Sequence, residues 1–131
     1  MDKSIFKAYD IRGKYPKEIN EKVVFEICGF LAQFFKKGRA VVAYDARLSS
    51  PRLYRAVVDG FEKSGRKIGL IKIGLATTPM FYFLVNYFKA QGGVMVTASH
   101  NPKEYNGLKV VGKGARMISG KEILRIMNKE L

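Results

Sequence analysis

The chain has 131 residues, 47% of them hydrophobic and 27% charged, a composition that fits one globular domain and excludes an intrinsically disordered tail. Its 24 Lys and Arg residues against 11 Asp and Glu residues give a net charge of +13, which indicates an anionic partner or an acidic neighbouring domain. Cys28 is the single cysteine, so a disulfide within the chain is excluded and a reducing compartment is expected.

The first part of the chain predicts two short strands on either side of an amphipathic helix. Residues 5–11 are expected to form a strand that enters a turn at Gly13. Between residues 18 and 37, apolar side chains recur at helical spacing, and Gly38 follows as a stop signal. The short apolar run at 41–44 predicts a buried strand.

Two further helices share one kind of start signal. Ser50 followed by Pro51, and Thr78 followed by Pro79, each combine an N-cap residue with the favoured first helical residue. The first of these helices is expected to end at Gly65 and the second near residue 88. Three more strands are predicted between and after them, at 68–73, 94–97 and 108–111.

The chain closes on a helix that Ser119 and Glu122 begin with the spacing of a capping box. Alternation of strands and helices predicts an α/β fold, a single three-layer domain over 1–131. It would hold a mixed, mostly parallel sheet of about four strands with helices on both faces. Ligands of such sheets bind beyond the carboxyl ends of the strands, so the loops after Tyr44, Gly74 and Val96 are expected to form one rim.

The helix predicted at 78–88 is apolar nearly all round. Such a helix is either buried at the centre of a fold or carries a surface that lacks its partner. Both interpretations stay open from the sequence.

The segment Thr97-Ala98-Ser99-His100-Asn101-Pro102 places a hydroxyl, an imidazole and an amide at the carboxyl end of a predicted strand. His100 is the only histidine. A Ser/His/Asp hydrolase is disfavoured, because adjacent residues of an extended segment point to opposite sides and the G-x-S-x-G pattern is absent. The alternative to a catalytic loop is an ordinary hydrogen-bonded turn.

Three other segments carry groups suited to phosphate chemistry. Arg12, within Tyr9-Asp10-Ile11-Arg12-Gly13, and Arg47, two residues after Asp45, present planar guanidinium groups that match phosphate oxygens, although a local ion pair is the usual meaning of such spacing. Asn106-Gly107 predicts a hairpin turn, from which Lys109 would begin a strand beside the Ser99 loop. A lysine in a partly desolvated pocket can act as a general acid or base.

Together and in this order, these segments resemble the α-D-phosphohexomutase family, the phosphomannomutases and phosphoglucomutases. TASHNP at 97–102 is similar to the phosphoserine loop of the family, and YNGLK at 105–109, YDIRG at 9–13 and YDARLSS at 44–50 are similar to its other first-domain motifs. The stretch 74–79 resembles the family's turn into its third helix. The resemblance covers essentially the whole chain.

The resemblance implies that Ser99 carries a phosphoryl group and passes it to a hexose phosphate through a hexose 1,6-bisphosphate intermediate, which also serves as activator. Lys109 would act as general acid or base, and His100 would position the substrate hydroxyl. A Mg²⁺ ion would bind the phosphate of Ser99. The remaining residues implied in phosphate and substrate binding are Tyr9, Arg12, Asn101 and Arg47.

Members of the family have four domains, and this chain resembles the first, with no counterpart of domains II–IV. No two of its carboxylates have the D-x-D spacing of the family's magnesium loop. The isolated chain is therefore expected to be inactive and to need domains II–IV or a partner chain carrying them.

A different class of function is a stand-alone anion- or nucleic-acid-binding module, which the net charge favours and the scattered lysines disfavour. A scaffold with a degenerate site is a third hypothesis, weakened by the intact Ser99, His100 and Lys109. Residues 1–9 lack the apolar region of a signal peptide, and no apolar run could span a bilayer, so no membrane partner and a cytoplasmic location are expected.

Overall fold

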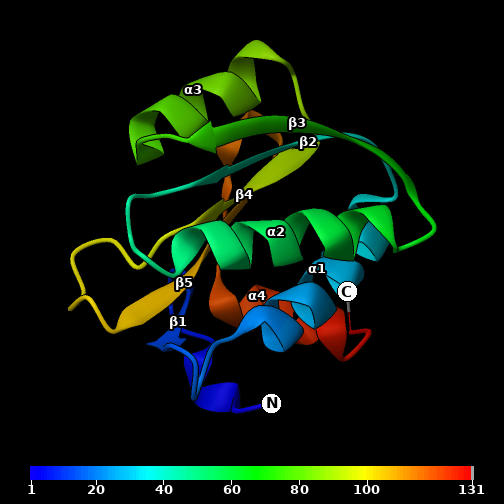
Figure 1. Ribbon diagram of the computed structural model, residues 1–131. Coiled ribbons are helices and arrows are strands. Elements are labelled where there is room, and N and C mark those ends of the chain that lie inside the picture. The colour runs from blue at the N-terminus through cyan, green and yellow to red at the C-terminus, as the bar shows by residue number, and fades with distance from the viewer. Residues whose placement is uncertain (131) are drawn as a thin grey trace.

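A mixed six-stranded sheet runs through the molecule in the order β1-β5-β4-β2-β3, with β6 paired to β5 (Figure 1). The computed structural model describes residues 1–130. The strands are β1 (Ile11–Lys14), β2 (Lys37–Tyr44), β3 (Lys67–Leu75), β4 (Gly92–Val96), β5 (Tyr105–Gly112) and β6 (Met117–Ile118). The helices are α1 (Glu21–Phe35), α2 (Ser50–Glu62), α3 (Thr78–Tyr87) and α4 (Gly120–Met127), with short 3₁₀ turns η1 (Lys3–Ile5) and η2 (Lys113–Ala115).

Strand direction divides the sheet into two halves. β2 pairs in parallel with β3 and with β4, so the carboxyl ends of these three strands lie at one edge. β5 runs antiparallel to β4, β1 and β6. The predicted α/β class is confirmed, with six strands in place of about four.

Helices cover both faces of the sheet, as predicted. Figure 1 shows α1, α2 and α4 on one side and α3 alone on the other. The larger core lies under the three helices and includes Ile27, Leu31, Val57 and Phe61, all buried. The smaller core lies under α3, where Phe81 and Val85 pack on the opposite face of the sheet.

The apolar helix α3 is not a buried central helix, so that interpretation of the sequence is wrong. Phe81 and Val85 face the sheet and are fully buried, whereas Met80, Phe83 and Tyr87 are 48%, 59% and 66% exposed. One helix alone on a sheet face buries only the side chains that point at the sheet, whatever the character of the others.

The first predicted strand is misplaced, because Ile5 ends η1 and residues 6–10 form a bend, in which Phe6 makes an isolated antiparallel bridge with Ile11. Asp2 accepts a hydrogen bond from the Ser4 amide at 2.8 Å and so begins η1. The Lys7 amide then donates to the Asp10 carbonyl at 2.8 Å, which turns the chain before β1 begins at Ile11.

The predicted hairpin turn at Asn106-Gly107 is also wrong, since both residues lie inside β5. They pair with Gly13 and Arg12 of β1. The Asn106 side chain is fully buried and donates to the hydroxyls of Ser49 and Ser50 at 2.8 and 3.0 Å. These contacts with a distant segment satisfy the amide that would otherwise favour a turn.

Helix caps follow the local sequence closely, with shifts of one residue. The cap of α2 is Ser49 in place of Ser50, and the Thr77 hydroxyl in place of that of Thr78 caps α3 by accepting from the Met80 amide at 3.3 Å. The capping box of Ser119 and Glu122 is confirmed at the start of α4. Within residues 1–130, none of the helices combines the length and apolar character that a bilayer crossing requires.

Cys28 offers a direct test of the packing between α1 and α2. Its side chain is fully buried, and burial raises the pKa of the thiol, so the reactive thiolate is scarce at neutral pH. We expect iodoacetamide at pH 7.5 to leave the native chain unmodified and to alkylate it fully in 8 M urea, as followed by intact mass. Rapid alkylation without urea would contradict this burial.

Candidate active site

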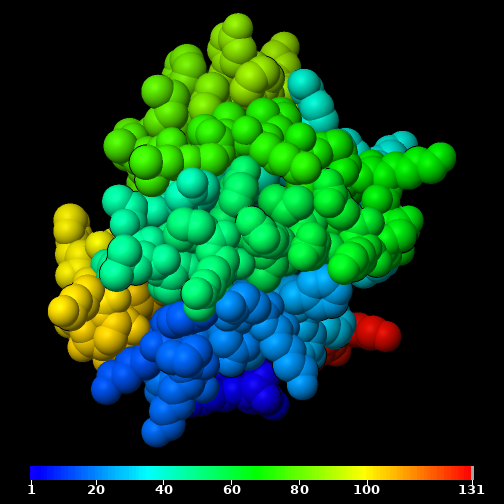
Figure 2. Space-filling view, in the orientation of Figure 1, coloured from blue at the N-terminus to red at the C-terminus, as the bar shows by residue number. Residues whose placement is uncertain are grey.

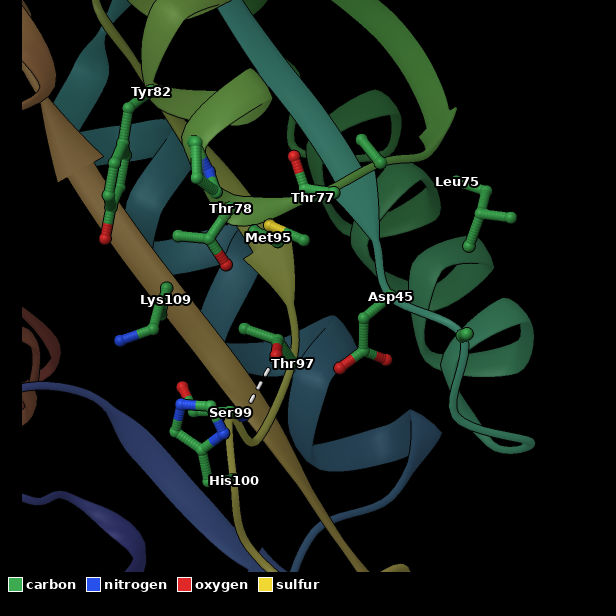
Figure 3. A pocket seen from close by; sticks show the side chains of 13 residues that line it. Asp45, Leu75, Thr77, Thr78, Tyr82, Met95, Thr97, Ser99, His100 and Lys109 are labelled. Atoms are coloured by element: carbon green, nitrogen blue, oxygen red, sulfur yellow. Dashed lines mark hydrogen bonds between the residues drawn. The ribbon is translucent and has the colours of Figure 1, made fainter.

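The loops at the carboxyl ends of β2, β3 and β4 surround an open pocket of about 840 Å³ (Figure 3). Residues 45–46 follow β2, residues 76–79 follow β3, and residues 97–100 follow β4. Lys109 enters from the antiparallel strand β5, and Tyr82 from α3. The sheet topology therefore brings together the three loops that the sequence predicted as one rim.

Ser99 lies in this pocket on a backbone that few side chains tolerate. Its φ is +56°, in the left-handed region, and its amide donates to the Thr97 hydroxyl at 3.0 Å. A positive φ is uncommon for a non-glycine residue, and within residues 1–130 it is shared by Lys36, Lys89, Ala115 and Lys129, so the angle shapes the loop and does not mark a function by itself. The bond to the buried Thr97 side chain fixes the backbone that presents the exposed side chain of Ser99.

Lys109 and Arg12 share one buried carboxylate, that of Asp10. The Asp10 side chain is only 5% exposed, accepts from Arg12 Nε at 2.8 Å and lies 3.9 Å from Lys109 Nζ. Figure 3 shows Ser99 and His100 together at one end of the pocket with Lys109 on the strand beside them. The cation of Lys109 is thus held at the pocket wall by a negative charge beneath it.

Arg47 lies under the loop that carries Ser99. Its Nη1 donates to the carbonyls of Pro102 and Tyr105 at 2.8 and 3.1 Å, and its Nη2 donates to those of Ser99 and Asn101 at 2.8 and 2.7 Å. The loop stands out at one side of the molecule in Figure 2, in yellow.

A family model described as phosphoglucomutase/phosphomannomutase, alpha/beta/alpha domain I, matches residues 3–130. The chain belongs to this family. A protein named phosphohexose mutases from Xanthomonas campestris is 50% identical over 114 residues, 87% of this chain and 25% of that protein. A phosphomannomutase from Escherichia coli is 42% identical over 120 residues, 92% of this chain and 26% of that protein.

Solved structures agree with this assignment. The crystal structure of a phosphoglucomutase/phosphomannomutase family protein from Burkholderia thailandensis superposes with a TM-score of 0.82 at 34% identity, covering 100% of this chain and 31% of that one. A phosphomannomutase of Thermus thermophilus, described as putative, gives 0.81 at 28% identity, covering 94% of this chain and 29% of that one. The chain thus spans about a quarter of the length of the first curated phosphohexomutases that it matches.

The phosphate-binding residues expected from the phosphohexomutase motifs are not all gathered in the pocket. Tyr9 is 66% exposed and, like Arg12, lies outside the pocket lining. The Asn101 side chain donates to the Ala98 carbonyl at 2.8 Å, which closes the turn after Ser99. Contacts of these three side chains with a phosphate stay predictions.

Magnesium requires oxygen ligands, and in this domain the donor set is small. Ser99 turns its hydroxyl to the pocket, where a phosphoryl group would add suitable oxygens. The Asp45 carboxylate lines the same pocket, but its Oδ1 accepts from Ser50 Oγ at 2.6 Å and its Oδ2 lies 3.4 Å from Arg47 Nε. Among the residues described, no three His, Cys, Asp or Glu side chains are grouped for a metal. Among the described residues, a magnesium ion in this pocket would need the oxygens of a phosphoryl group on Ser99, and that phosphorylation stays a prediction.

Two site residues were missed from the sequence because their partners are distant. Asp10 was seen only as part of the YDIRG segment, and its contact with Lys109 spans 99 positions. Asn106 was taken for a turn residue, yet it links β5 to Ser50 and so to Asp45. For Asn106, the sequence held one usable signal, the joint presence of the segments YDARLSS and YNGLK. The hydrogen bonds of Asn106 connect these two segments.

Proposed function

We propose that this domain carries the phosphoryl-accepting serine, Ser99, of a phosphohexomutase that interconverts hexose 1-phosphate and hexose 6-phosphate. The observation that supports the proposal most is the exposed Ser99 hydroxyl, held on a left-handed backbone in the pocket that Lys109 also lines. The family match across residues 3–130 and the names of the relatives support the reaction class.

The proposed reaction has two balanced halves. A hydroxyl oxygen of the substrate attacks the phosphorus on Ser99, the new O–P bond forms, and the bond between phosphorus and Ser99 Oγ breaks. The substrate hydroxyl loses its proton and Ser99 Oγ gains one, so the bisphosphate leaves a free serine. The bisphosphate then turns over and returns its other phosphoryl group to Ser99 by the reverse transfer.

Lys109 is proposed as the general acid or base of these proton transfers, and His100 as the residue that orients the substrate hydroxyl. The position of Lys109 in the pocket that Ser99 also lines supports its role, since a group that transfers a proton must lie within reach of the reacting hydroxyl. Arg12, Tyr9, Asn101 and Arg47 are the residues that the family resemblance implies in phosphate and substrate binding. Bound magnesium supplies neutralisation of charge on the transferring phosphoryl group.

We expect residues 1–131 alone to show no mutase turnover with Mg²⁺, hexose 1-phosphate and catalytic hexose 1,6-bisphosphate, in a coupled assay for hexose 6-phosphate. The reason is that the relatives at 25% and 26% coverage are about four times as long, and the proposal places the magnesium and sugar contacts in that remainder. In a parallel assay, domains II–IV of a relative are added as a separate chain, and we expect some turnover to return. Robust turnover by residues 1–131 would contradict the need for further domains.

The second candidate function, an anion- or nucleic-acid-binding module, rests on the net charge of +13. Non-specific binding to phosphates falls steeply as salt rises, so the affinity for duplex DNA that persists at physiological salt separates the two: a binding module would keep a dissociation constant well below the micromolar range. The mutase proposal predicts only binding in the non-specific range, with a dissociation constant of about 10⁻⁴ to 10⁻⁶ M at physiological salt.

A cytoplasmic location stays part of the proposal, and the buried free thiol of Cys28 supports it.

A further inference from the structure

The Ser99 loop makes few backbone hydrogen bonds of its own. Between β4 and β5, the Asn101 amide donates to Ala98 and the Tyr105 amide to Pro102, at 3.1 and 3.0 Å. Pro102 has no amide hydrogen to give. The carbonyls of this segment therefore need partners from elsewhere if the loop is to hold one conformation.

Arg47 supplies those partners from a different part of the chain. Its two terminal nitrogens donate to four carbonyl oxygens at 2.7 to 3.1 Å, across 52 to 58 positions of sequence. The side chain is only 14% exposed, so these charge-assisted bonds form with little competition from water. One guanidinium group thus binds carbonyls on both sides of the loop and holds its backbone in one conformation.

Arg47 is itself held in place. Its Nε lies 3.4 Å from Asp45 Oδ2, and its amide donates to Asp45 Oδ1 at 3.1 Å. The four terminal N–H groups are used on carbonyls, and the remaining nitrogen, Nε, lies in an ion pair with the Asp45 carboxylate, so no terminal N–H is left for a phosphate.

We infer that Arg47 is the positioning residue of the phosphoserine loop: it fixes the backbone that presents Ser99 and does not bind substrate phosphate. The inference takes from the proposed function the role of Ser99 as phosphoryl carrier. It replaces the phosphate contact that the family resemblance implied for Arg47. Lysine cannot take over, because its single ammonium group cannot reach four carbonyls arranged around a planar fork.

The first test measures loop order directly and needs no activity. In the 131-residue chain, amide hydrogen exchange of peptides covering 97–106 is expected to become at least about tenfold faster in Arg47→Lys and Arg47→Met. Losing even one hydrogen bond between the guanidinium group and a loop carbonyl makes local opening easier by that factor. Peptides from β2 and α1 should exchange as in the wild type. The matched control is Arg66→Lys, an exposed arginine whose side chain bonds only Gln33 among the residues described.

Two results would overturn the inference. One is unchanged exchange at 97–106 in both Arg47 variants, and the other is faster exchange throughout the chain, which would make Arg47 a general stabiliser of the fold. Arg47→Lys keeps the charge and most of the length, so it remains informative if Arg47→Met fails to fold.

The second test separates positioning from phosphate binding in the assembled enzyme. The maximal rate of phosphoryl transfer through Ser99 is expected to fall at least tenfold in Arg47→Lys, with the half-saturating hexose phosphate concentration within threefold of wild type. An unchanged maximal rate with a much higher half-saturating concentration of hexose phosphate would instead assign Arg47 to direct binding of the substrate phosphate. If no variant, wild type included, carries phosphate on Ser99, the proposed function fails, while the exchange data still decide the role of Arg47.

Discussion

Replacing Ser99 by alanine is expected to abolish phosphoryl uptake from hexose 1,6-bisphosphate in the assembled enzyme and to leave the fold intact. The substitution removes the one oxygen proposed to carry the group, so the covalent intermediate cannot form and turnover falls by orders of magnitude. The hydroxyl is exposed, and the bond that orders this residue comes from its amide, so the free energy of unfolding should change by about 1 kcal/mol or less.

The matched variants make this result specific. Ser99→Gly removes the same hydroxyl while tolerating the φ of +56°, so it should be equally inactive and as well folded. Ser4→Ala, an exposed serine in η1, should keep full activity. Phosphopeptide mass spectrometry after incubation with hexose 1,6-bisphosphate identifies the serine that carries the phosphoryl group. Phosphate on Ser4, Ser49, Ser50, Ser64 or Ser119, together with a fully active Ser99→Ala, would refute the assignment.

Gly107→Ala is expected to be the most destabilising single methyl addition in the sheet. A Cβ at this position would overlap the Ile11 carbonyl oxygen and lie 2.9 Å from the Ile11 carbonyl carbon and 3.0 Å from Arg12 Cα. All three atoms belong to the backbone of β1, which no side-chain rotation can relieve. We expect a loss of about 3 kcal/mol or more in unfolding free energy, at the upper end of overpacking effects.

Urea unfolding followed by circular dichroism measures this effect, and Gly29→Ala in α1 is the control. Nothing lies within 4 Å of a Cβ built at Gly29, and alanine is the better helix former, so this variant should gain about 0.5 to 1 kcal/mol. A Gly107→Ala protein within 1 kcal/mol of wild type would mean that β1 does not hold this register against β5.

Local signals allowed the sequence to predict much of this domain. The capping box of Ser119 and Glu122 and the proline starts of α2 and α3 depend on hydrogen bonds and backbone angles within four residues, so they form wherever the segment lies. Short apolar runs likewise placed β2 and β4, because parallel strands buried on both faces need continuous apolar side chains, and a run at 68–73 placed the edge strand β3. The Ser99 segment at the end of β4 followed from the same pattern.

Tertiary structure alone decided where the side chains of the other candidate site residues lie and what they contact. Asn106-Gly107 has the local preference of a turn, yet pairing with β1 and the buried bonds to Ser49 and Ser50 hold it in β5. Arg47 has the chemistry of a phosphate ligand, yet the carbonyls that it binds lie more than 50 positions away. A side chain's donors go to the acceptors that folding brings near, and no local pattern in the sequence records which acceptors those are.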